Sequence, residues 1–534
     1  MSGATPDPKP VVLVVDDLRP SYDSLVTNVN NYQSGRLAAE FDFEYVGSYG
    51  ELRDWYQRNS DRFVSLIIQD VDFTHVHDER KLVGQPEALR PAQQPFDVRA
   101  LQGLLIYGSM RQNNIDRVAP VLFVSCRVGT ESITEFSSFI VNPGYGSCSF
   151  VPESAVGEEY YPRICEQIDS LALRPLTQDK RRRWIEQHHM VTGRARKMAF
   201  LTYEIERIGS SDAIVLLLGK PGVGKELVAN ALHRCSDRYS SGDPLREYPR
   251  TVNMAALDKN LIEDDMFGHE RGAYTGSAGE RAGIFEAADG STVFLDEIGD
   301  IDQDTQRKLL RAIEYHRIKR IGSSAEIDVD MRIIATTNRA IDDLQVRFRP
   351  DFYARLAQHC IVVPSLRERW ENEPGRVLES DIEDFFDYIL DVMNRNPRHR
   401  RKLQMERTAV RFVRQLIEEY IDGGNTIFIG NIRTLRNIIE RSYERAQYDG
   451  SKEVGLGHVM PTIGLVRLMN AQSAPKPVAG GTIENVVGSL KLEAVESLAI
   501  REALAKNGNN QTKAADELGI HRDTLHRKMG ELNI

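Results

Sequence analysis

Short apolar runs, separated by longer polar stretches that suit helices, mark the first third of the chain. The runs are Val11–Val15, Phe43–Val46, Ser65–Ile68, Val121–Val124 and Ser149–Val151. Each is short and rich in β-branched or aromatic residues, which is typical of strands. Strands that alternate with helices form parallel sheets covered on both faces. The segment is therefore predicted to be a doubly wound α/β domain.

A second segment, from about residue 183 to residue 451, again mixes strands and helices. The charged stretch Gln178–Arg183 before it is typical of a solvated linker or a helix start. After it, Ala471–Gly481 has the Ala, Pro and Gly content of a flexible tether. The remaining residues, to Ile534, have a wholly helical pattern.

Composition narrows the setting of the protein. A chain of 534 residues is too long for one core, and about three domains are expected. The net charge of −10 gives no general nucleic-acid signature, so any DNA contact must be local to one module. The five cysteines form no CxxC pair or zinc-type cluster. No secretory signal stands at the N-terminus, and no apolar run approaches the ~20 residues of a membrane span, so a cytoplasmic protein with no membrane contact is expected.

A glycine-rich loop between a strand and a helix indicates phosphate binding. The strand run Ile214–Leu218 leads into a GxxxxGK pattern and then into the helical stretch Leu227–His233. Glycines allow backbone N–H groups to face phosphates, and a lysine adds a full positive charge. The residues predicted to bind the nucleotide are Gly219, Lys220, Pro221, Gly222, Val223, Gly224, Lys225 and Glu226. Glu226 takes the place where the general motif has Ser or Thr.

Two acidic residues end an apolar strand about seventy residues further on. Ser291–Leu295 leads directly into Asp296 and Glu297. Asp296 is predicted to hold Mg²⁺, directly or through water, and Glu297 to orient or deprotonate the attacking water. Together with the phosphate loop, the acidic pair predicts hydrolysis of a nucleoside triphosphate.

Between these two motifs lies a small-residue loop with one aromatic side chain. It consists of Gly272, Ala273, Tyr274, Thr275, Gly276 and Ser277. A flexible stalk that presents one ring suits transient insertion against a partner protein. The alternative is a glycine-rich connector whose Tyr274 packs back on its own domain.

The tail carries a helix-turn-helix pattern. Ala514, Ala515 and Leu518 are apolar at helical spacing, Gly519 is a natural stop, and a second helical stretch follows. The second helix is predicted to present its basic residues to double-stranded DNA, some to base edges and some to phosphates. These residues are Arg522, His526, Arg527 and Lys528.

The loop 272–277 resembles the GAFTGA loop of sigma-54-dependent transcriptional activators, with Tyr274 for Phe and Ser277 for Ala. In that family the loop engages the sigma factor. The phosphate loop ends in Gly-Lys-Glu, which is similar to the form of this motif in the same family. The tail resembles the Fis-type DNA-binding module that ends the family's chains. The resemblance implies an AAA+ α/β domain with a helical lid, with ATP and Mg²⁺ as ligands.

Further residues fall on the family's ATPase positions. Asn253 matches the residue that restrains the catalytic Glu, and Thr337 and Asn338 match sensor I. Arg349 and Arg355 match the arginine fingers, and Arg433 matches sensor II. Thr434 departs from the usual Glu, and Ile427–Ile429 from the usual Tyr-Pro-Trp-Pro-like lead. A finger acts from a neighbouring subunit, so the resemblance implies self-association from dimer to hexameric ring.

The first segment resembles the receivers of two-component response regulators. Asp16 and Asp17 follow the first strand, and Asp70 ends the third. They are predicted to form a Mg²⁺ site with Asp70 as phosphoacceptor and Ser125 as switch hydroxyl. Val151-Pro152 stands where receivers have Lys-Pro. Input then comes either from a sensor kinase or, in a degenerate receiver, from binding another protein or a ligand.

These features predict a cytoplasmic activator that binds upstream DNA and remodels sigma-54 RNA polymerase by ATP hydrolysis in a ring. The alternative is an ATP-modulated DNA-binding regulator that no longer engages sigma-54; an ATPase for another client is disfavoured by the DNA-binding tail. The expected domains are a receiver-like regulatory domain (1–172), a linker (173–195), a sigma-54-interaction AAA+ domain (196–455), a flexible linker (456–484) and a Fis-type helix-turn-helix domain (485–534).

Overall fold

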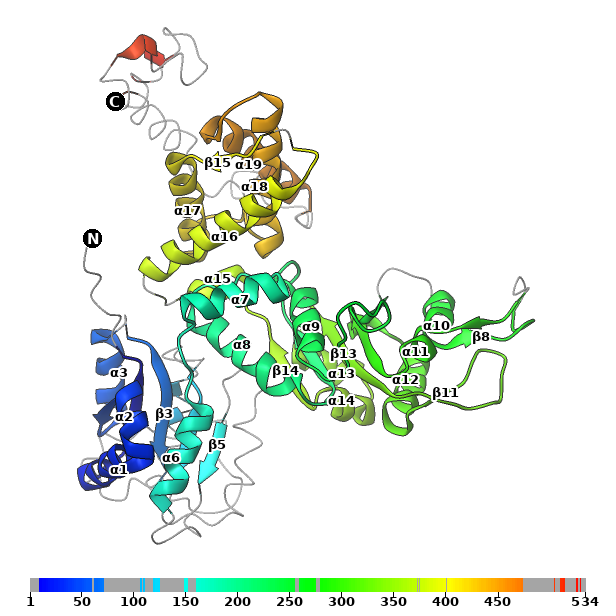
Figure 1. Ribbon diagram of the computed structural model, residues 1–534, viewed down its shortest axis with the longest axis horizontal. Helices are drawn as coiled ribbons and strands as arrows, with labels where there is room; N and C mark the ends of the chain where they lie inside the picture. The colour runs from blue at the N-terminus through cyan, green and yellow to red at the C-terminus, as the bar shows by residue number, and fades with distance from the viewer. Residues whose placement is uncertain are drawn as a thin grey trace, which may run out of the picture. The chain divides into compact units, whose positions relative to one another are not determined.

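The computed structural model describes most of the first 473 residues and a few beyond (Figure 1). The described residues are 9–59, 62–71, 106–107, 109–110, 119–124, 148–151, 160–254, 259–274, 279–371, 373, 375–399, 401–473, 504, 510–513, 525–526 and 529. The chain divides into two compact units. One comprises Met1–Lys220, Gly224–Pro364 and Asn372–Asp381, and the other Pro221–Val223, Ser365–Glu371 and Ile382–Ile534.

The first sheet is parallel, with strand order β2-β1-β3-β4-β5. Its strands are β1 (Val11–Val15), β2 (Asp42–Val46), β3 (Val64–Asp70), β4 (Val121–Val124) and β5 (Cys148–Val151). The predicted strand runs were therefore correct to within two residues at each end. This order is that of flavodoxin-like doubly wound sheets. The predicted doubly wound fold is confirmed.

Helices cover both faces of this sheet because alternate strand residues point to opposite sides. On one face, Val12 and Val14 of β1 pack with α1 (Arg19–Asn31), α2 (Arg36–Glu40) and α6 (Tyr160–Leu171). On the other face, Leu13 and Val15 pack with Leu52 and Trp55 of α3 (Tyr49–Arg58).

The second sheet has strand order β14-β6-β13-β10-β7, and all its pairs are parallel. Its strands are β6 (Val215–Leu218), β7 (Arg250–Asn253), β10 (Ser291–Asp296), β13 (Met331–Thr337) and β14 (His359–Val362). Numbered within this sheet, the order is 5-1-4-3-2. Every residue of β6 and β13 is buried, as expected for central strands of a parallel sheet.

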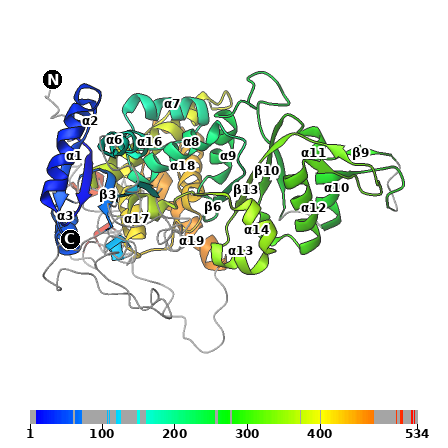
Figure 2. The ribbon, with the colours of Figure 1, turned by 90° about the horizontal axis from the view of Figure 1, so that it is seen from below.

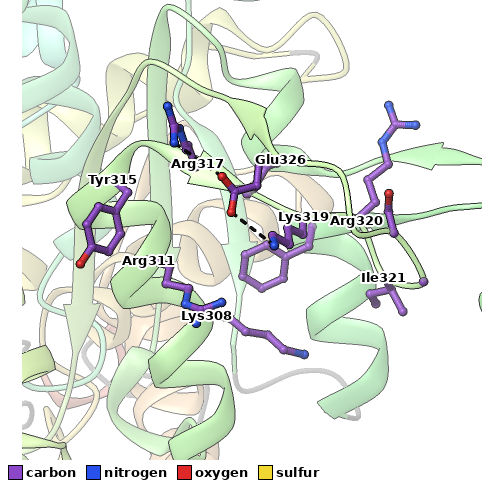
Figure 3. Close-up of a pocket in the computed structure, with 12 residues that line it drawn as sticks. Lys308, Arg311, Tyr315, Arg317, Lys319, Arg320, Ile321 and Glu326 are labelled. Carbon is purple, nitrogen blue, oxygen red and sulfur yellow. Dashed lines mark ion pairs between the residues drawn. The ribbon is translucent and has the colours of Figure 1, made fainter.

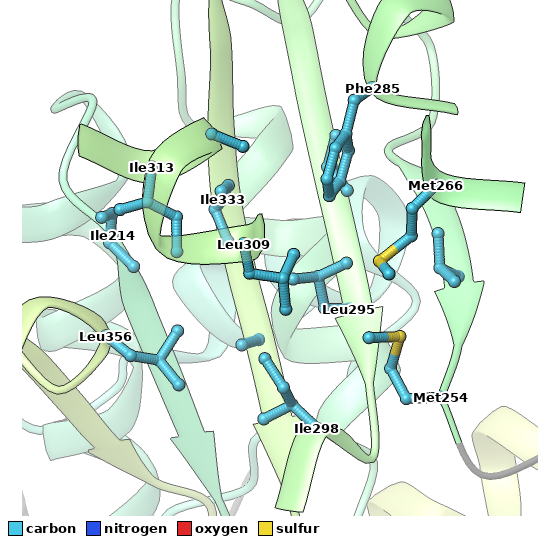
Figure 4. Close-up of a cluster of buried hydrophobic side chains, with 14 of the residues drawn as sticks. Ile214, Met254, Met266, Phe285, Leu295, Ile298, Leu309, Ile313, Ile333 and Leu356 are labelled. Carbon is cyan, nitrogen blue, oxygen red and sulfur yellow. The ribbon is translucent and has the colours of Figure 1, made fainter. Parts of the chain in front are cut away.

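One large hydrophobic cluster holds this sheet to its helices (Figure 4). Leu295 of β10 and Ile333 of β13 face Leu309 and Ile313 of α12 (Gln303–Tyr315). The helix α12 forms here because its apolar residues recur at helical spacing and because Asp302 caps its N-terminus, accepting from the N–H groups of Asp304 and Thr305.

Other helices surround the same sheet. They are α7 (Gln178–His188), α8 (Arg196–Gly209), α9 (Lys225–Arg234), α10 (Lys259–Phe267), α11 (Ile284–Ala287), α13 (Ile341–Arg347) and α14 (Pro350–Leu356), with the 3₁₀ turn η5 (Ile298–Asp300). Two short antiparallel pairs extend from this layer, β8 (Gly268–His269) with β9 (Arg281–Ala282), and β11 (Arg317–Ile318) with β12 (Ile327–Asp328). Figures 1 and 2 both show the β8–β9 arm projecting beyond α10.

The other unit is mainly helical. It contains α15 (Leu366–Trp370), most of α16 (Gly375–Arg395), α17 (Arg407–Ile421), α18 (Asn431–Tyr448) and α19 (Leu456–Ser473), with a short parallel pair of β15 (Gln404–Met405) and β16 (Glu453–Val454). Ser365 and Glu368 form a reciprocal capping box that starts α15.

Two segments expected to be linkers contain helices. The stretch 173–195 contains α7, in which Arg181 and Trp184 are buried, so the charged run there is a helix start. The stretch 456–484 begins with α19, whose Val459, Ile463 and Val466 are buried. Of the helices in the described part of the chain, none is long and apolar enough to span a membrane.

Candidate functional site

The predicted phosphate loop follows β6 directly, at the carboxyl edge of the second sheet. Gly222 has φ +76° and Gly224 has φ +99°, the left-handed region that glycine adopts without strain. Gly222 also lacks room for a side chain, because a Cβ there would lie 2.2 Å from the carbonyl oxygen of Gly430. The loop ends at the N-terminus of α9, where unpaired helix N–H groups favour anions.

Lys225 links the phosphate loop to the acidic strand end. Its side chain is buried, and its Nζ donates to the carbonyl oxygen of Gly219 (2.8 Å) and lies 3.6 Å from Glu297 Oε1. Glu226, the unusual residue of the motif, is exposed in the first turn of α9. The negative charge of Glu226 is therefore in contact with solvent.

The acidic pair lies where β10 ends. Asp296 Oδ1 accepts a hydrogen bond from Thr336 Oγ1 (2.6 Å), and the same hydroxyl oxygen accepts from the Glu297 N–H (3.2 Å). Glu297 has φ 57° and ψ 48°, an uncommon conformation for a non-glycine residue that turns the chain sharply after the strand. Asp296 pairs in register with Asn253 on β7, so the predicted restraining residue is beside the acidic pair.

The predicted sensor I residues lie on the neighbouring strand. Thr337 is the last residue of β13 and is fully buried, and its Oγ1 accepts from the Arg339 N–H (3.1 Å). The Asn338 N–H donates to Glu297 Oε2 (3.2 Å). Sequence reasoning missed Thr336, whose hydroxyl organises both acidic residues; only the register of β13 against β10 places it there.

These contacts bring the predicted hydrolytic residues together at one edge of the sheet. Parallel α/β sheets bind ligands outside the carboxyl ends of their strands. Asp296 provides a carboxylate oxygen of the kind Mg²⁺ prefers, while phosphate oxygens and water can supply the other ligands. The arrangement therefore fits a nucleotide with its Mg²⁺ ion.

The two predicted arginine fingers lie at opposite ends of α14: Arg349 is its N-cap and Arg355 lies in its last turn. Their surroundings differ. Arg349 caps α14, and its guanidinium makes two hydrogen bonds to Asp351, of 3.1 and 2.7 Å. The Arg355 Nε atom is buried and has no hydrogen-bond partner within the described part of the chain. Among the described residues, neither arginine forms a hydrogen bond or ion pair with Lys225 or Glu297.

The predicted sensor II residue, Arg433, lies in the first turn of α18. The Arg433 N–H donates to the carbonyl oxygen of Gly222 (3.2 Å), and its side chain is exposed. Asn431 supports this turn with its buried side chain, donating to the Pro221 carbonyl (2.9 Å) and accepting from the Leu366 N–H (3.1 Å). The unusual lead Ile427–Ile429 is accommodated by burial of Phe428 against Tyr420.

The predicted output loop is described as far as Tyr274. Gly272 has φ +83° and open space around it, and Tyr274 is 47% exposed. The Tyr274 ring contacts His269 edge-on, with centroids 5.1 Å apart, and His269 Nδ1 in turn pairs with Asp264 (2.5 Å). Tyr274 thus has half its surface available while one edge packs on its own domain. Thr275, Gly276 and Ser277 lie outside the described residues.

The β11–β12 hairpin supports the root of this loop. The Ile321 N–H donates to the Gly268 carbonyl (2.8 Å), and the Glu270 N–H donates to the Ile321 carbonyl (3.0 Å). Gly322 has φ +83°, and a Cβ there would lie 2.8 Å from the Cβ of Ala273. The output loop and the hairpin are therefore in direct contact.

A basic pocket of about 660 Å³ opens between α12 and this hairpin (Figure 3). Its cationic residues are Lys308, Arg311, Arg317, Lys319 and Arg320. Carboxylates neutralise most of them: Glu326 lies 3.3 Å from Lys319, Glu263 lies 2.7 Å from Lys308, and Glu286 lies 2.6 Å from Arg320. The pocket is accordingly a network of ion pairs rather than a concentrated positive charge.

The first sheet brings its three predicted acids together. Asp16, Asp17 and Asp70 each offer a carboxylate oxygen, all within 4.8 Å of one another. Burial, followed by the charges of Asp16 and Glu51, raises the pKa of the neighbouring Tyr45 to about 12. Such a cluster suits a divalent cation. Ser125 and Pro152 lie outside the described residues, and Val151 is buried in β5.

The predicted DNA-binding helix is described at only a few positions. His526 is exposed and follows the buried Leu525. Arg522, Arg527 and Lys528 lie outside the described residues.

The parallel 5-1-4-3-2 sheet, the phosphate loop and the acidic strand end define an AAA+ ATPase fold. Residues 191–362 match the family model for the Sigma-54 interaction domain, and residues 491–532 match the model for the bacterial regulatory protein, Fis family.

Known proteins with similar sequences are transcriptional regulators. The transcriptional regulatory protein ZraR of Salmonella typhimurium is 39% identical over 342 residues, which are 63% of this chain and 67% of ZraR. The nitric oxide reductase transcription regulator NorR2 of Cupriavidus necator is 36% identical over 356 residues, 63% of this chain and 62% of NorR2. The crystal structure of NtrX from Brucella abortus with ADP aligns over 99% of this chain and 100% of that one, at 20% identity and a TM-score of 0.43.

The chain therefore belongs to the sigma-54-dependent transcriptional activators. It combines the sigma-54 interaction domain with a Fis-type DNA-binding domain, so both predictions from the sequence motifs are confirmed.

Proposed function

We propose that this activator hydrolyses ATP at the carboxyl edge of the second sheet. One observation carries the proposal: Lys225 of the phosphate loop lies 3.6 Å from Glu297, whose other carboxylate oxygen accepts from the Asn338 N–H. Lys225 would neutralise phosphate charge, Asp296 would hold Mg²⁺, and Glu297 would orient and deprotonate the attacking water. Mg²⁺ itself would supply charge stabilisation at the transferred phosphoryl group.

The active form of the enzyme is proposed to be a ring, hexameric as in the family. Within the described part of the chain, neither Arg349 nor Arg355 pairs with Lys225 or Glu297 of its own site, and the Arg355 Nε atom is buried without a hydrogen-bond partner. A buried guanidinium nitrogen without a hydrogen-bond partner can donate to an anion that another subunit presents. The fingers of one subunit would thus complete the site of the next.

The output of hydrolysis is proposed to be movement of the loop 272–277 against sigma-54, while the Fis-type module holds the ring on upstream double-stranded DNA. The half-exposed ring of Tyr274, on a glycine-rich stalk braced by the β11–β12 hairpin, supports this role. Tyrosine is one of the residues enriched at the energetic hot spots of protein interfaces.

The decisive test is open-complex formation with purified sigma-54 holoenzyme and ATP. Tyr274→Ala should abolish open complexes while ATPase and DNA binding remain within about twofold of the parent, because Tyr274 is 47% exposed and its loss should disturb the ATPase domain little. Tyr274→Phe should keep activity. Tyr448→Ala serves as the control, since Tyr448 is 93% exposed at the end of α18.

Failure of the parent protein to form open complexes, with ATPase and DNA binding intact, would contradict the activator mechanism. It would favour the ATP-modulated DNA-binding regulator instead. The contact between Tyr274 and His269 supports this second function, because it shows the Tyr274 ring packed on its own domain.

For the first sheet we propose a phosphorylated receiver. The cluster of Asp16, Asp17 and Asp70 supports a Mg²⁺ site, and Asp70 would accept the phosphoryl group from a sensor kinase or a small phosphodonor. The apolar Val151 in place of a lysine leaves the phosphoryl charge to be balanced chiefly by the cation.

Acetyl phosphate with Mg²⁺ should therefore phosphorylate the full chain once, and Asp70→Ala should remove the label entirely. Asp54→Ala, an exposed acid on α3, should leave it unchanged. Absence of any label on the parent protein would instead indicate a domain that receives its input by binding a protein or ligand.

A further inference from the structure

Asp343 of α13 forms ion pairs with two arginines. Arg339 precedes the helix and Arg347 ends it. Asp343 Oδ2 accepts from Arg339 Nη1 (2.7 Å), and Asp343 Oδ1 accepts from Arg347 Nε (3.0 Å). The two arginines lower the pKa of the Asp343 carboxyl, which therefore stays ionised at neutral pH. Both of its oxygens are committed to these partners.

The first arginine is tied to the hydrolytic residues. Arg339 directly follows Asn338, whose N–H donates to Glu297 Oε2 (3.2 Å). Its guanidinium also pairs with Asp300, in the turn that begins immediately after Glu297. Space there is tight, because a Cβ on Gly299 would lie 2.8 Å from the Arg339 Cδ. Arg339 is thus joined to Glu297 by two routes, through Asn338 and through the turn that contains Asp300.

The second arginine is tied to the finger segment. Arg347 ends α13, two residues before Arg349. The buried side chain of Gln306 joins the two backbones, since its Nε2 donates to the Arg347 carbonyl (3.4 Å) and its Oε1 accepts from the Arg349 N–H (2.9 Å). Gln306 therefore links the end of α13 to Arg349, the residue that caps α14.

We propose that Asp343 is a positioning residue, which couples a subunit's own hydrolytic residues to the arginine fingers that it presents to its neighbour. The inference rests on the proposed function, in which those fingers act in the next subunit. Hydrogen-bonded ion pairs are directional, so a change of partner at Glu297 moves Arg339, and Asp343 transmits the movement to Arg347 and the fingers. Neighbouring sites then hydrolyse in a linked order.

The variant Asp343→Asn keeps the shape of the side chain and removes its charge. The kcat of the full-length assembly should fall about 3- to 10-fold, because the variant weakens two ion pairs that are partly exposed to solvent. The KM for ATP should stay within about twofold of the parent value. Asp342→Asn, at the adjacent exposed carboxylate, should match the parent. A parent-like kcat for Asp343→Asn would overturn the proposal.

Mixed rings distinguish a defect in the fingers from a defect in the subunit's own site. Lys225→Ala subunits cannot hydrolyse ATP but carry intact fingers. Added in excess to Asp343→Asn, they should restore the rate per Asp343→Asn subunit to at least about half the parent value, because the defective fingers are replaced by good ones. A merely structural defect would not respond to the neighbour.

The same mixture made with Arg355→Ala tests the shared site itself. No recovery in that mixture would contradict the proposed ring mechanism. Recovery with Arg355→Ala but not with Asp343→Asn would overturn the role of Asp343 alone. Should Asp343→Asn melt at a markedly lower temperature than the parent, Arg347→Gln, at a half-exposed side chain, must show the same fall in kcat and the same recovery.

Discussion

Glu297→Gln should bind ATP as the parent does and hydrolyse it at least about 100-fold more slowly, the usual loss when a general base is removed. The amide oxygen of glutamine can still accept from the Asn338 N–H, so the local turn is kept. What disappears is the negative charge that lies 3.6 Å from Lys225 and that would take the proton of the attacking water. Single-turnover hydrolysis and nucleotide binding by fluorescence separate the two effects.

Glu314→Gln is a suitable control, because Glu314 is an exposed acid on α12. It should hydrolyse ATP at the parent rate. A Glu297→Gln protein that retained a tenth or more of the parent kcat would exclude Glu297 as the base. A variant that lost nucleotide binding as well would point to a structural role in holding Lys225.

Features encoded by contiguous residues were predictable from the sequence. The strand β1 was predicted with its bounds, and the runs for β3 and β10 fell within the observed strands, because short buried strands leave an uninterrupted apolar run. The phosphate loop could be assigned because its GxxxxGK pattern lies between a strand run and a helical stretch, and the structure gives Gly222 and Gly224 the positive φ values that glycine adopts freely.

The contacts that organise the site were not predictable, because they join residues far apart in the chain. Thr336 reaches Asp296 across 40 positions, and Gln306 reaches Arg349 across 43. Nothing in the local sequence distinguishes Asp343, which holds two arginines, from the exposed Asp342 beside it. The signal for α19 was present, since Val459, Ile463 and Val466 recur at helical spacing, but Pro461 inside the helix obscured it.

A buried arginine is the strongest case of a residue that only the fold reveals. Arg332 of β13 is 1% exposed, and its guanidinium donates to the carbonyl oxygens of Ile208, Gly209, Ala213 and Leu232, at 2.7 to 3.4 Å. It thereby satisfies carbonyl groups at the C-terminal end of α8 and in the last turns of α9, where helix dipoles favour a cation. Burial lowers the pKa of Arg332 to about 10, so the side chain is still charged at neutral pH.

Arg332→Met should therefore destabilise the second sheet by about 3 to 5 kcal/mol, since methionine fills part of the volume but leaves four buried carbonyl groups without their donor. Thermal unfolding of the full chain, followed by calorimetry, should show that transition displaced to lower temperature or lost. Arg332→Lys keeps a cation with a single donor nitrogen, so its stability should lie between that of the parent and that of Arg332→Met. Arg311→Met, at an exposed arginine of α12, should change stability by no more than about 0.5 kcal/mol. An Arg332→Met protein as stable as Arg311→Met would show that the four carbonyl groups find other donors and that the buried charge contributes nothing to the fold.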